Sequence, residues 1–196
     1  MKWIYLTAMA LLASCGLNAE DKAAAAANGP SYVDEAPLPE GWPKPGPYNV
    51  VVEKSYPAYR AAFTEGRGQS GSFWTLFAHI KRNDIPMTAP VEMVVEPQAE
   101  GGMSRNSMAF LYQNTDVGTV GKDGGRVEIR DIPATRTLSY AWMGPDSDEN
   151  LELAKQALEA ALAERKLVAK SFRLLGYNGP RTPNARKTWE LVALLE

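Results

Sequence analysis

The chain has 196 residues, of which 45% are hydrophobic and 22% are charged. This balance is typical of a globular protein and excludes a wholly disordered or fibrous chain. The formal net charge is -2, and lysine and arginine form no dense stripe, so the sequence predicts no nucleic-acid partner.

The first residues have the pattern of a secretory signal peptide. Lys2 precedes an apolar run from Trp3 to Leu12, which is too short to span a bilayer. The run ends in LASC, which resembles the bacterial lipobox, where cleavage precedes a cysteine that carries lipid, and Cys15 is the only cysteine of the chain. We therefore expect a lipoprotein signal peptide over residues 1–14 and a lipid-anchored protein of the bacterial envelope that faces the periplasm or the exterior. An ordinary signal peptide with an incidental cysteine is the alternative.

Residues 15–47 are expected to form a tether between the lipidated Cys15 and the folded part of the chain. From Asn18 to Pro47 the sequence contains AAAAA and six prolines, with almost no apolar periodicity. Such a segment cannot bury enough surface to offset the entropy that its ordering costs. We expect one folded domain, residues 48–196, which has no cysteine for a disulfide, a thiolate nucleophile or a metal cluster.

The first half of this domain is expected to contain strands around one helix. Residues 49–63, NVVVEKSYPAYRAAF, are β-branched and aromatic, and Pro57 makes them one bent strand or two short ones. Residues 72–82 repeat apolar side chains at i, i+3, i+4 and i+7, which predicts a helix with one strongly apolar face. Two strands are expected to follow, over 87–96 and 106–114.

The second half repeats that order after a glycine-rich turn. Alternating apolar and polar residues indicate half-buried antiparallel strands, and a long apolar stripe indicates a helix, which Asp146 and Glu149 begin as a capping box. The sequence therefore predicts an α+β domain in which two βαββ units form one curved antiparallel sheet with two helices. The elements expected in this half are a turn (118–125), strands (126–132 and 137–143), a helix (146–167) and closing strands (171–177 and 187–195).

Gly66, Gly68 and Gly71 match the G-x-G-x-x-G pattern of dinucleotide-binding loops. That site needs a parallel βαβ unit, whereas the strand after this helix is flanked and broken by prolines. Two helices are also too few for a doubly wound sheet. We interpret these glycines as a flexible turn that leads into the helix.

Catalytic chemistry is not expected. GQSGS, at residues 68–72, misses the G-x-S-x-G nucleophile elbow at its last position, and no two carboxylates form a recognisable acid and base pair. One histidine, His79, and no available cysteine cannot build a closed metal site. Aromatic and methionine side chains are abundant instead, and they suit either core packing or a groove for a flat apolar ligand.

Two stretches resemble the SOUL haem-binding family. FWTLFAHIKRNDIPMTAPVEM, residues 73–93, is similar to the family signature, in which a helix of the form F-W-x-L-x-x-Y-I leads to M-T-A-P-V. GYNGPRTPNARKTWELVAL, residues 176–194, resembles the closing G-Y-x-x-P and R-x-N-E-V-W-like strand, although both this strand and the KRNDIP loop depart from the pattern. The resemblance covers residues 48–196. It implies a duplicated βαββ fold with a barrel-like antiparallel sheet, of the SOUL and effector-binding-domain kind.

The resemblance further implies non-covalent binding of haem or a related tetrapyrrole in an apolar groove beside the first helix. Lys81 and Arg82 are then candidates to pair with the haem propionates. His79 replaces the tyrosine of the signature and is a candidate axial ligand of the haem iron, the alternative being a half-exposed histidine at the flank of the helix. Carried over residue by residue, the candidate haem-binding residues are Phe73, Trp74, Phe77, His79, Lys81, Arg82 and Met87.

We therefore expect reversible tetrapyrrole binding without catalysis, in a protein that contacts the membrane through its lipid anchor and holds no metal other than a haem iron. Two alternatives stay open at this point. One is a binding module for another amphipathic small molecule, because an apolar groove alone does not specify a porphyrin. The other is an envelope interaction module in which the sheet edge or the groove receives a peptide.

Overall fold

The computed structural model describes residues 31–65, 68–98 and 102–196. The predicted signal peptide, the lipidation site at Cys15 and the first part of the predicted tether lie outside these residues. Within the described part of the chain, no helix is long and apolar enough to cross a membrane.

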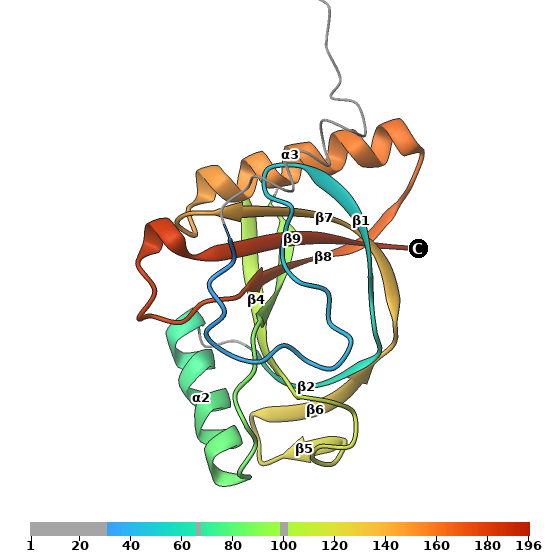
Figure 1. The fold of residues 1–196 in the computed structure, drawn as a ribbon. Coiled ribbons are helices and arrows are strands. Elements are labelled where there is room, and N and C mark those ends of the chain that lie inside the picture. The colour runs from blue at the N-terminus through green and yellow to red at the C-terminus, as the bar shows by residue number, and fades with distance from the viewer. Residues whose placement is uncertain (1–30, 66–67, 99–101) are drawn as a thin grey trace, which may run out of the picture.

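The described residues form a nine-stranded sheet flanked by α-helices (Figure 1). Neighbouring strands follow the order β1-β7-β9-β8-β3-β4-β2-β6-β5, and the strands pair in antiparallel fashion. The predicted α+β class with a curved antiparallel sheet is thus confirmed. The elements are β1 (Val51–Tyr56), β2 (Tyr59–Glu65), α2 (Gly68–Arg82), β3 (Val91–Pro97), β4 (Met103–Leu111), β5 (Gly121–Asp123), β6 (Val127–Ile132), β7 (Thr135–Met143), α3 (Asp148–Arg165), β8 (Ala169–Gly176), the 3₁₀ helix η1 (Asn184–Arg186) and β9 (Thr188–Leu195).

Two βαββ units build most of the sheet, as the element order predicted. The unit β2-α2-β3-β4 supplies the neighbouring strands β3, β4 and β2, and the unit β7-α3-β8-β9 supplies β7, β9 and β8. In both units the first strand lies outermost and the last strand lies in the middle. The units meet where β3 pairs with β8, with Met93 opposite Leu174.

The curvature of the sheet is associated with a bend at Pro57. β1 and β2 flank this bend and lie opposite β7 and β6 without a change of register, because Tyr56 pairs with Thr135 and Tyr59 with Ile132. Proline has a fixed φ and no N–H donor, which interrupts the ladder at this point. β1 is the first strand in the sheet order, whereas β2 lies near the other end, between β4 and β6. Because the bend joins these two distant strands, the sheet curls into a barrel-like surface (Figure 1).

The alternating side chains of the strands supply two hydrophobic clusters, one on each face of the sheet. On β2, Ala62 belongs to the first cluster, whereas Ala61 and Phe63 belong to the second. Leu76 of α2 and Leu158 of α3 are fully buried in the first cluster. Both helices therefore stand on the same face of the sheet.

Residues 31–47, called the strap from here on, cover the second cluster. The Trp42 side chain is only 7% exposed, and its ring centroid lies 4.6 Å from that of Tyr56 and 5.1 Å from that of Tyr59. Its indole N–H donates to the Tyr177 hydroxyl at 3.4 Å. Figure 1 shows the strap, in blue, crossing the sheet.

Polar contacts hold the beginning of the strap. The Glu35 carboxylate accepts hydrogen bonds from the backbone N–H of Gly179, at 2.7 Å, and from the Thr182 hydroxyl. The Asn178 amide donates to the Val33 carbonyl at 2.8 Å. For residues 31–47 the structure therefore differs from the predicted free tether. Burial of one indole and several hydrogen bonds offset the entropy cost of ordering this segment, although its average composition is not that of a folded segment.

Two glycine-rich stretches also differ from the predictions. α2 begins at Gly68, so Gly68 and Gly71 lie in the first turn of the helix rather than in a flexible turn before it, and Gly66 lies outside the described residues. The predicted turn over 118–125 contains β5, a strand of three residues that pairs with β6.

The N-terminus of α3 is capped by a different residue from the predicted one. The Ser147 hydroxyl accepts a hydrogen bond from the backbone N–H of Asn150 at 3.2 Å, which makes Ser147 the N-cap. Asp146 instead accepts from the Arg105 guanidinium at 2.6 Å. The predicted capping box of Asp146 and Glu149 is therefore wrong, because Ser147 is the N-cap and Asp146 pairs with Arg105 of β4.

Candidate functional site

One flank of α2 is smooth because small side chains follow one another at helical spacing. Gly71, Thr75 and Ala78 are at i, i+4 and i+7 and therefore lie on one face of the helix. The Thr75 hydroxyl donates back to the Gly71 carbonyl at 2.8 Å, so its polar end turns toward the helix backbone. No large side chain protrudes from these three positions, so a ligand can approach the helix backbone closely.

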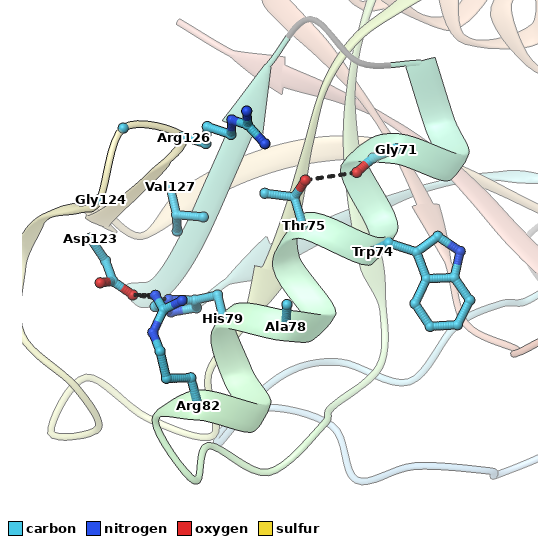
Figure 2. Close-up of a pocket in the computed structure, with 11 residues that line it drawn as sticks. Gly71, Trp74, Thr75, Ala78, His79, Arg82, Asp123, Gly124, Arg126 and Val127 are labelled. Atoms are coloured by element: carbon cyan, nitrogen blue, oxygen red, sulfur yellow. Dashed lines mark hydrogen bonds and ion pairs between the residues drawn. The ribbon is translucent and has the colours of Figure 1, made fainter.

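A pocket of about 750 Å³ lies between the smooth flank and the turn that joins β5 to β6 (Figure 2). This volume falls in the range of about 300–1,000 Å³ that small-molecule sites occupy. Gly124 and Gly125 form the turn, and Val127 adds an apolar side chain from the start of β6. The pocket wall is thus made mostly of small and apolar groups.

Two arginines supply positive charge at the rim of this pocket. The Arg82 side chain is 60% exposed, and its guanidinium donates to the Asp123 carboxylate at 2.5 Å. Arg126 is exposed and lines the pocket, and within the described residues its guanidinium makes no hydrogen bond or ion pair. The rim therefore has one arginine that is available to an anion.

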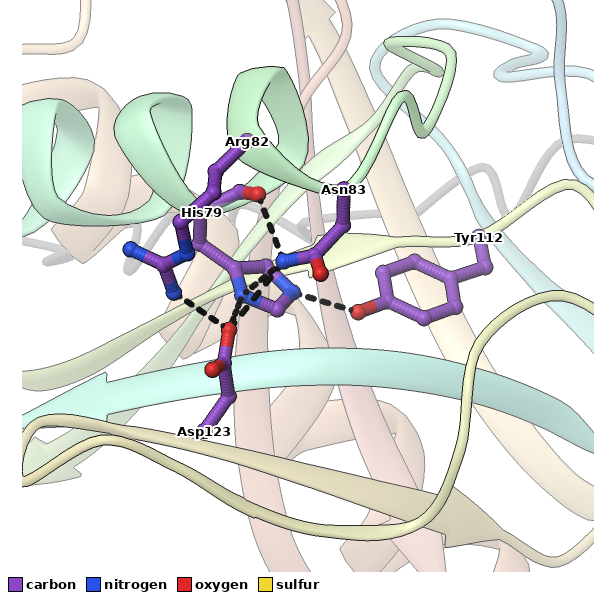
Figure 3. Close-up of polar contacts among 5 residues, drawn as sticks. All are labelled: His79, Arg82, Asn83, Tyr112 and Asp123. Atoms are coloured by element: carbon purple, nitrogen blue, oxygen red, sulfur yellow. Dashed lines mark hydrogen bonds and ion pairs between the residues drawn. The ribbon is translucent and has the colours of Figure 1, made fainter.

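His79 lies at the pocket but is buried and held from both sides (Figure 3). Its Nδ1 contacts the Asp123 carboxylate, and its Nε2 lies 2.7 Å from the Tyr112 hydroxyl. The pairing with a carboxylate places the proton on Nδ1, so that Nε2 accepts the hydrogen bond of the phenol. Asn83 also donates to Asp123, at 3.1 Å.

The environment of this network fixes the charge of its end members. The hydrogen bond with His79, followed by that with Arg82, lowers the pKa of the Asp123 carboxyl below its ordinary value of 3.8. Burial raises the pKa of Tyr112 to about 12, so this residue remains a neutral hydrogen-bond donor. Asp123 thereby attaches β5 to the C-terminal half of α2.

The predicted haem-binding residues are divided between two flanks of α2. Trp74, His79 and Arg82 line the pocket. Phe73 and Phe77 lie on the adjoining flank with stacked rings 6.0 Å apart, and the Trp74 ring stands perpendicular to both at 5.6 and 5.7 Å. We call Phe73, Trp74 and Phe77 the aromatic row.

Lys81 and Met87 lie outside the pocket. The Lys81 ammonium stands 5.6 Å from the ring centroid of Phe77, next to the aromatic row. Met87 is partly buried and packs against the first hydrophobic cluster, before β3. The structure therefore brings three of the seven predicted residues together in the pocket.

The structure gives His79 a different setting from either of those expected for it. The side chain is 3% exposed, not half-exposed, because the β5 hairpin covers this flank of the helix. Both ring nitrogens already have partners, whereas axial ligation needs one nitrogen with a free lone pair. In this arrangement His79 orients Asp123 and Tyr112 and does not present a ligand to the pocket.

Metal ligands do not gather elsewhere in the described part of the chain. Residues 31–65, 68–98 and 102–196 contain no group of three or more His, Cys, Asp or Glu side chains that could hold a metal ion.

The sequence matches the model of the SOUL heme-binding protein family over residues 46–192. The chain belongs to this family. The match confirms the resemblance carried by the helix and the M-T-A-P-V segment, and it extends from before the first βαββ unit into β9, the last strand of the second. No curated protein matches the sequence.

Solved structures of other proteins have the same fold. The EcmrR chain in a complex with DNA is 17% identical, with a TM-score of 0.56, and the match covers 74% of this chain and 57% of that one. The C-terminal domain of EcmrR is 18% identical, with a TM-score of 0.55, and 96% of it is covered by 74% of this chain. A hydrolase from Listeria innocua is 11% identical, with a TM-score of 0.55, and 94% of it is covered by 77% of this chain. At these identities the likeness concerns the fold alone.

The pocket residues fit a flat amphipathic anion such as haem. The smooth flank allows a planar ring system to approach the helix closely, and the exposed Arg126 guanidinium, which has no polar partner among the described residues, can pair with a carboxylate. The donor set does not fit an axial bond from His79. A haem in this pocket would therefore be held by its ring face and its propionates.

Proposed function

We propose that this SOUL domain binds haem or a related tetrapyrrole reversibly, without catalysis, in the pocket beside α2. The observation that carries the proposal is the smooth flank of Gly71, Thr75 and Ala78 next to the exposed guanidinium of Arg126, which has no polar partner among the described residues. Membership of the SOUL heme-binding protein family supports the same ligand class.

Each part of the pocket has a role in this proposal. The small side chains of α2 and the apolar Val127 exclude water from the two faces of the ring system. Arg126 binds a propionate, and the contacts of Asp123 with His79 and Arg82 keep β5 at the distance from α2 that the ligand requires. When bound, haem supplies a redox-active iron and an intense Soret band.

A second candidate is a module for another flat amphipathic anion. The occupied nitrogens of His79 favour this candidate, because a site in which His79 does not bind the iron recognises only a flat ring and its carboxylates, which other flat amphipathic anions also have. We expect haemin and metal-free protoporphyrin to bind the pocket with similar affinity. A strong preference for haemin with a histidine-ligated spectrum would contradict this assignment of His79.

Titration with haemin, followed by the Soret band, tests the proposed function. Ala78→Phe fills the smooth flank and is expected to abolish saturable binding. The matched control is Ala160→Phe, the same change at an exposed position of α3, which should bind as the unaltered chain does. Arg126→Glu should weaken binding about tenfold or more, since it removes a charge-assisted hydrogen bond and adds repulsion.

The outcomes separate the candidates. Absence of a saturable Soret change in the unaltered protein would overturn tetrapyrrole binding. Equal loss in the Ala78 and Ala160 variants would place the ligand away from the pocket.

The proposal includes a lipid anchor at Cys15, in an envelope protein that faces the periplasm or the exterior. The LASC sequence at the end of an apolar run supports this part. Cys15→Ser should prevent lipidation and release the protein from membranes. Unchanged membrane retention of this variant after high-salt washing would count against the anchor.

A further inference from the structure

The outermost ring of the aromatic row of α2, that of Trp74, points into solvent. Tetrapyrrole binding does not require this exposure. Trp74 is 62% exposed, although Phe73 and Phe77 beneath it are partly buried. In Figure 2 the indole projects from α2 away from Asp123 and Arg126, at the edge of the pocket that it lines. Tryptophan combines an apolar body with a polar N–H, and it is enriched where one side meets lipid and the other meets water.

The charges of α2 are of one sign. Between Gly68 and Arg82 the helix has no acidic residue, and its last turn carries the exposed Lys81 and Arg82. The Lys81 ammonium lies next to the aromatic row, 5.6 Å from the ring centroid of Phe77. A cation beside exposed aromatic rings is complementary to an apolar surface that is covered with anionic head groups.

α3 provides an internal comparison. It also exposes a large apolar side chain, Leu153, at 54%. Its sequence DENLELAKQALEAALAER, however, contains five acidic and two basic residues. An anionic surface would repel α3 and attract α2, so the charge pattern selects which helix faces such a surface.

We propose that the aromatic row docks on an anionic phospholipid membrane, with Trp74 at the level of the head groups and Lys81 paired with lipid phosphates. This inference rests on the proposed function and deepens it, because an amphipathic tetrapyrrole dissolved in the bilayer would reach the smooth flank directly from the lipid. The lipid anchor proposed at Cys15 would keep the domain near the same membrane, because only 15 residues separate Cys15 from Ser31.

Fluorescence quenching by brominated lipid tests the docking. The full chain is mixed with vesicles of brominated phosphatidylcholine and phosphatidylglycerol, and the emission of Trp74 is obtained as the difference between the unaltered chain and Trp74→Phe. We expect this difference emission to be strongly quenched. The matched control is the difference for Trp189→Phe, a half-buried tryptophan in β9, which should not be quenched.

Charge variants test the role of the head groups. Lys81→Glu should lower the quenching of Trp74, whereas Lys170→Glu, the same change at an exposed position of β8, should not. Because one lysine near an anionic surface contributes about fivefold in binding, the loss should vanish on vesicles of phosphatidylcholine alone.

The results separate docking from ligand binding. Quenching of Trp74 in a protein that gives no Soret change would support docking and overturn the proposed function. Saturable haem binding with an unquenched Trp74 would overturn docking and leave the proposed function in place. A third outcome is that lipid does not quench Trp74, while the solvent exposure of its indole falls as the protein concentration rises. This outcome would assign the aromatic row to contact between copies of the chain and would also overturn docking.

Discussion

Among single residues, Asp123 links β5 to the end of α2 through contacts with three side chains. Its carboxylate contacts His79, Arg82 and Asn83 at the end of α2, although it belongs to β5, a strand of three residues at the edge of the sheet. Such a short edge strand has few backbone hydrogen bonds of its own. The position of the pocket wall therefore depends on one carboxylate.

This dependence predicts a change of stability with pH. The pKa of the Asp123 carboxyl is lower in the folded protein than its ordinary value of 3.8, so the folded state binds a proton less readily than the unfolded state. The stabilisation is complete above about pH 4 and is lost as the pH falls through the lower, folded pKa. The difference in free energy of unfolding between the unaltered chain and Asp123→Asn, measured by urea denaturation, should be constant at neutral pH and shrink in acid.

The opposite trend, with a difference that grows in acid, would show that the network does not stabilise the ionised carboxylate. Asp84→Asn is the matched control, because Asp84 is exposed and makes no side-chain hydrogen bond within the described residues. Its effect on the unfolding free energy should stay small at each pH.

Among the elements, α3 shows how a helix end is specified. Ser147 satisfies a backbone N–H that would otherwise lack a partner, and Lys166 in the left-handed conformation ends the helix. Glu149 lies in the first turn, where a carboxylate interacts favourably with the helix dipole without acting as the cap.

Ser147→Ala should therefore lower the free energy of unfolding by about 1 kcal/mol, the usual effect of losing an N-cap side chain. Glu149→Ala is the comparison, because the predicted capping box assigned the reciprocal hydrogen bond to this residue. We expect it to cost less than Ser147→Ala in urea denaturation. A larger loss for the glutamate variant would restore the capping box.

Helices and strands with one buried face could be predicted from the sequence, because apolar periodicity reports that burial. The apolar repeats of α2 and α3 and the alternation of β6 and β7 report burial on one face, so these elements were predicted correctly. β5 has the sequence GKD, without an apolar residue, and is a strand only because β6 pairs with it. The contribution of such pairing is not visible in a local window.

Only the part of the candidate site that lies on α2 could be predicted, because a local sequence window does not show tertiary contacts. The spacing of Gly71, Thr75 and Ala78 is present in the sequence and could have indicated the smooth flank. Asp123 and Arg126 could not be found in this way, since they are more than 40 residues from His79 and reach α2 only through the tertiary fold. The burial of His79 by the β5 hairpin is likewise a tertiary effect.

For the whole molecule, the strap extends the folded domain by 17 residues before Tyr48. Trp42 closes the second hydrophobic cluster, where its indole lies among Tyr56, Tyr59 and Tyr177. The family match begins at residue 46 and does not include this tryptophan. The folded unit of the protein thus begins before the region that the family model matches.

Trp42→Ala is expected to lower the free energy of unfolding by about 3–5 kcal/mol, because it removes a large buried side chain and leaves a cavity. Trp74→Ala is the matched control and should cost far less, since Trp74 is 62% exposed. Both are measured by urea denaturation at neutral pH. Equal losses for the two variants would mean that the strap does not contribute to the core in solution.

The strap would also limit how far the domain can travel from the lipid anchor that we propose at Cys15. Docking of residues 31–47 leaves 15 residues between Cys15 and Ser31, and even a fully extended chain of that length reaches only about 55 Å. With the strap released, the free length would roughly double. If Cys15 carries the proposed lipid, the domain is confined to a thin layer next to the bilayer, where the local concentration of a membrane-dissolved ligand is high.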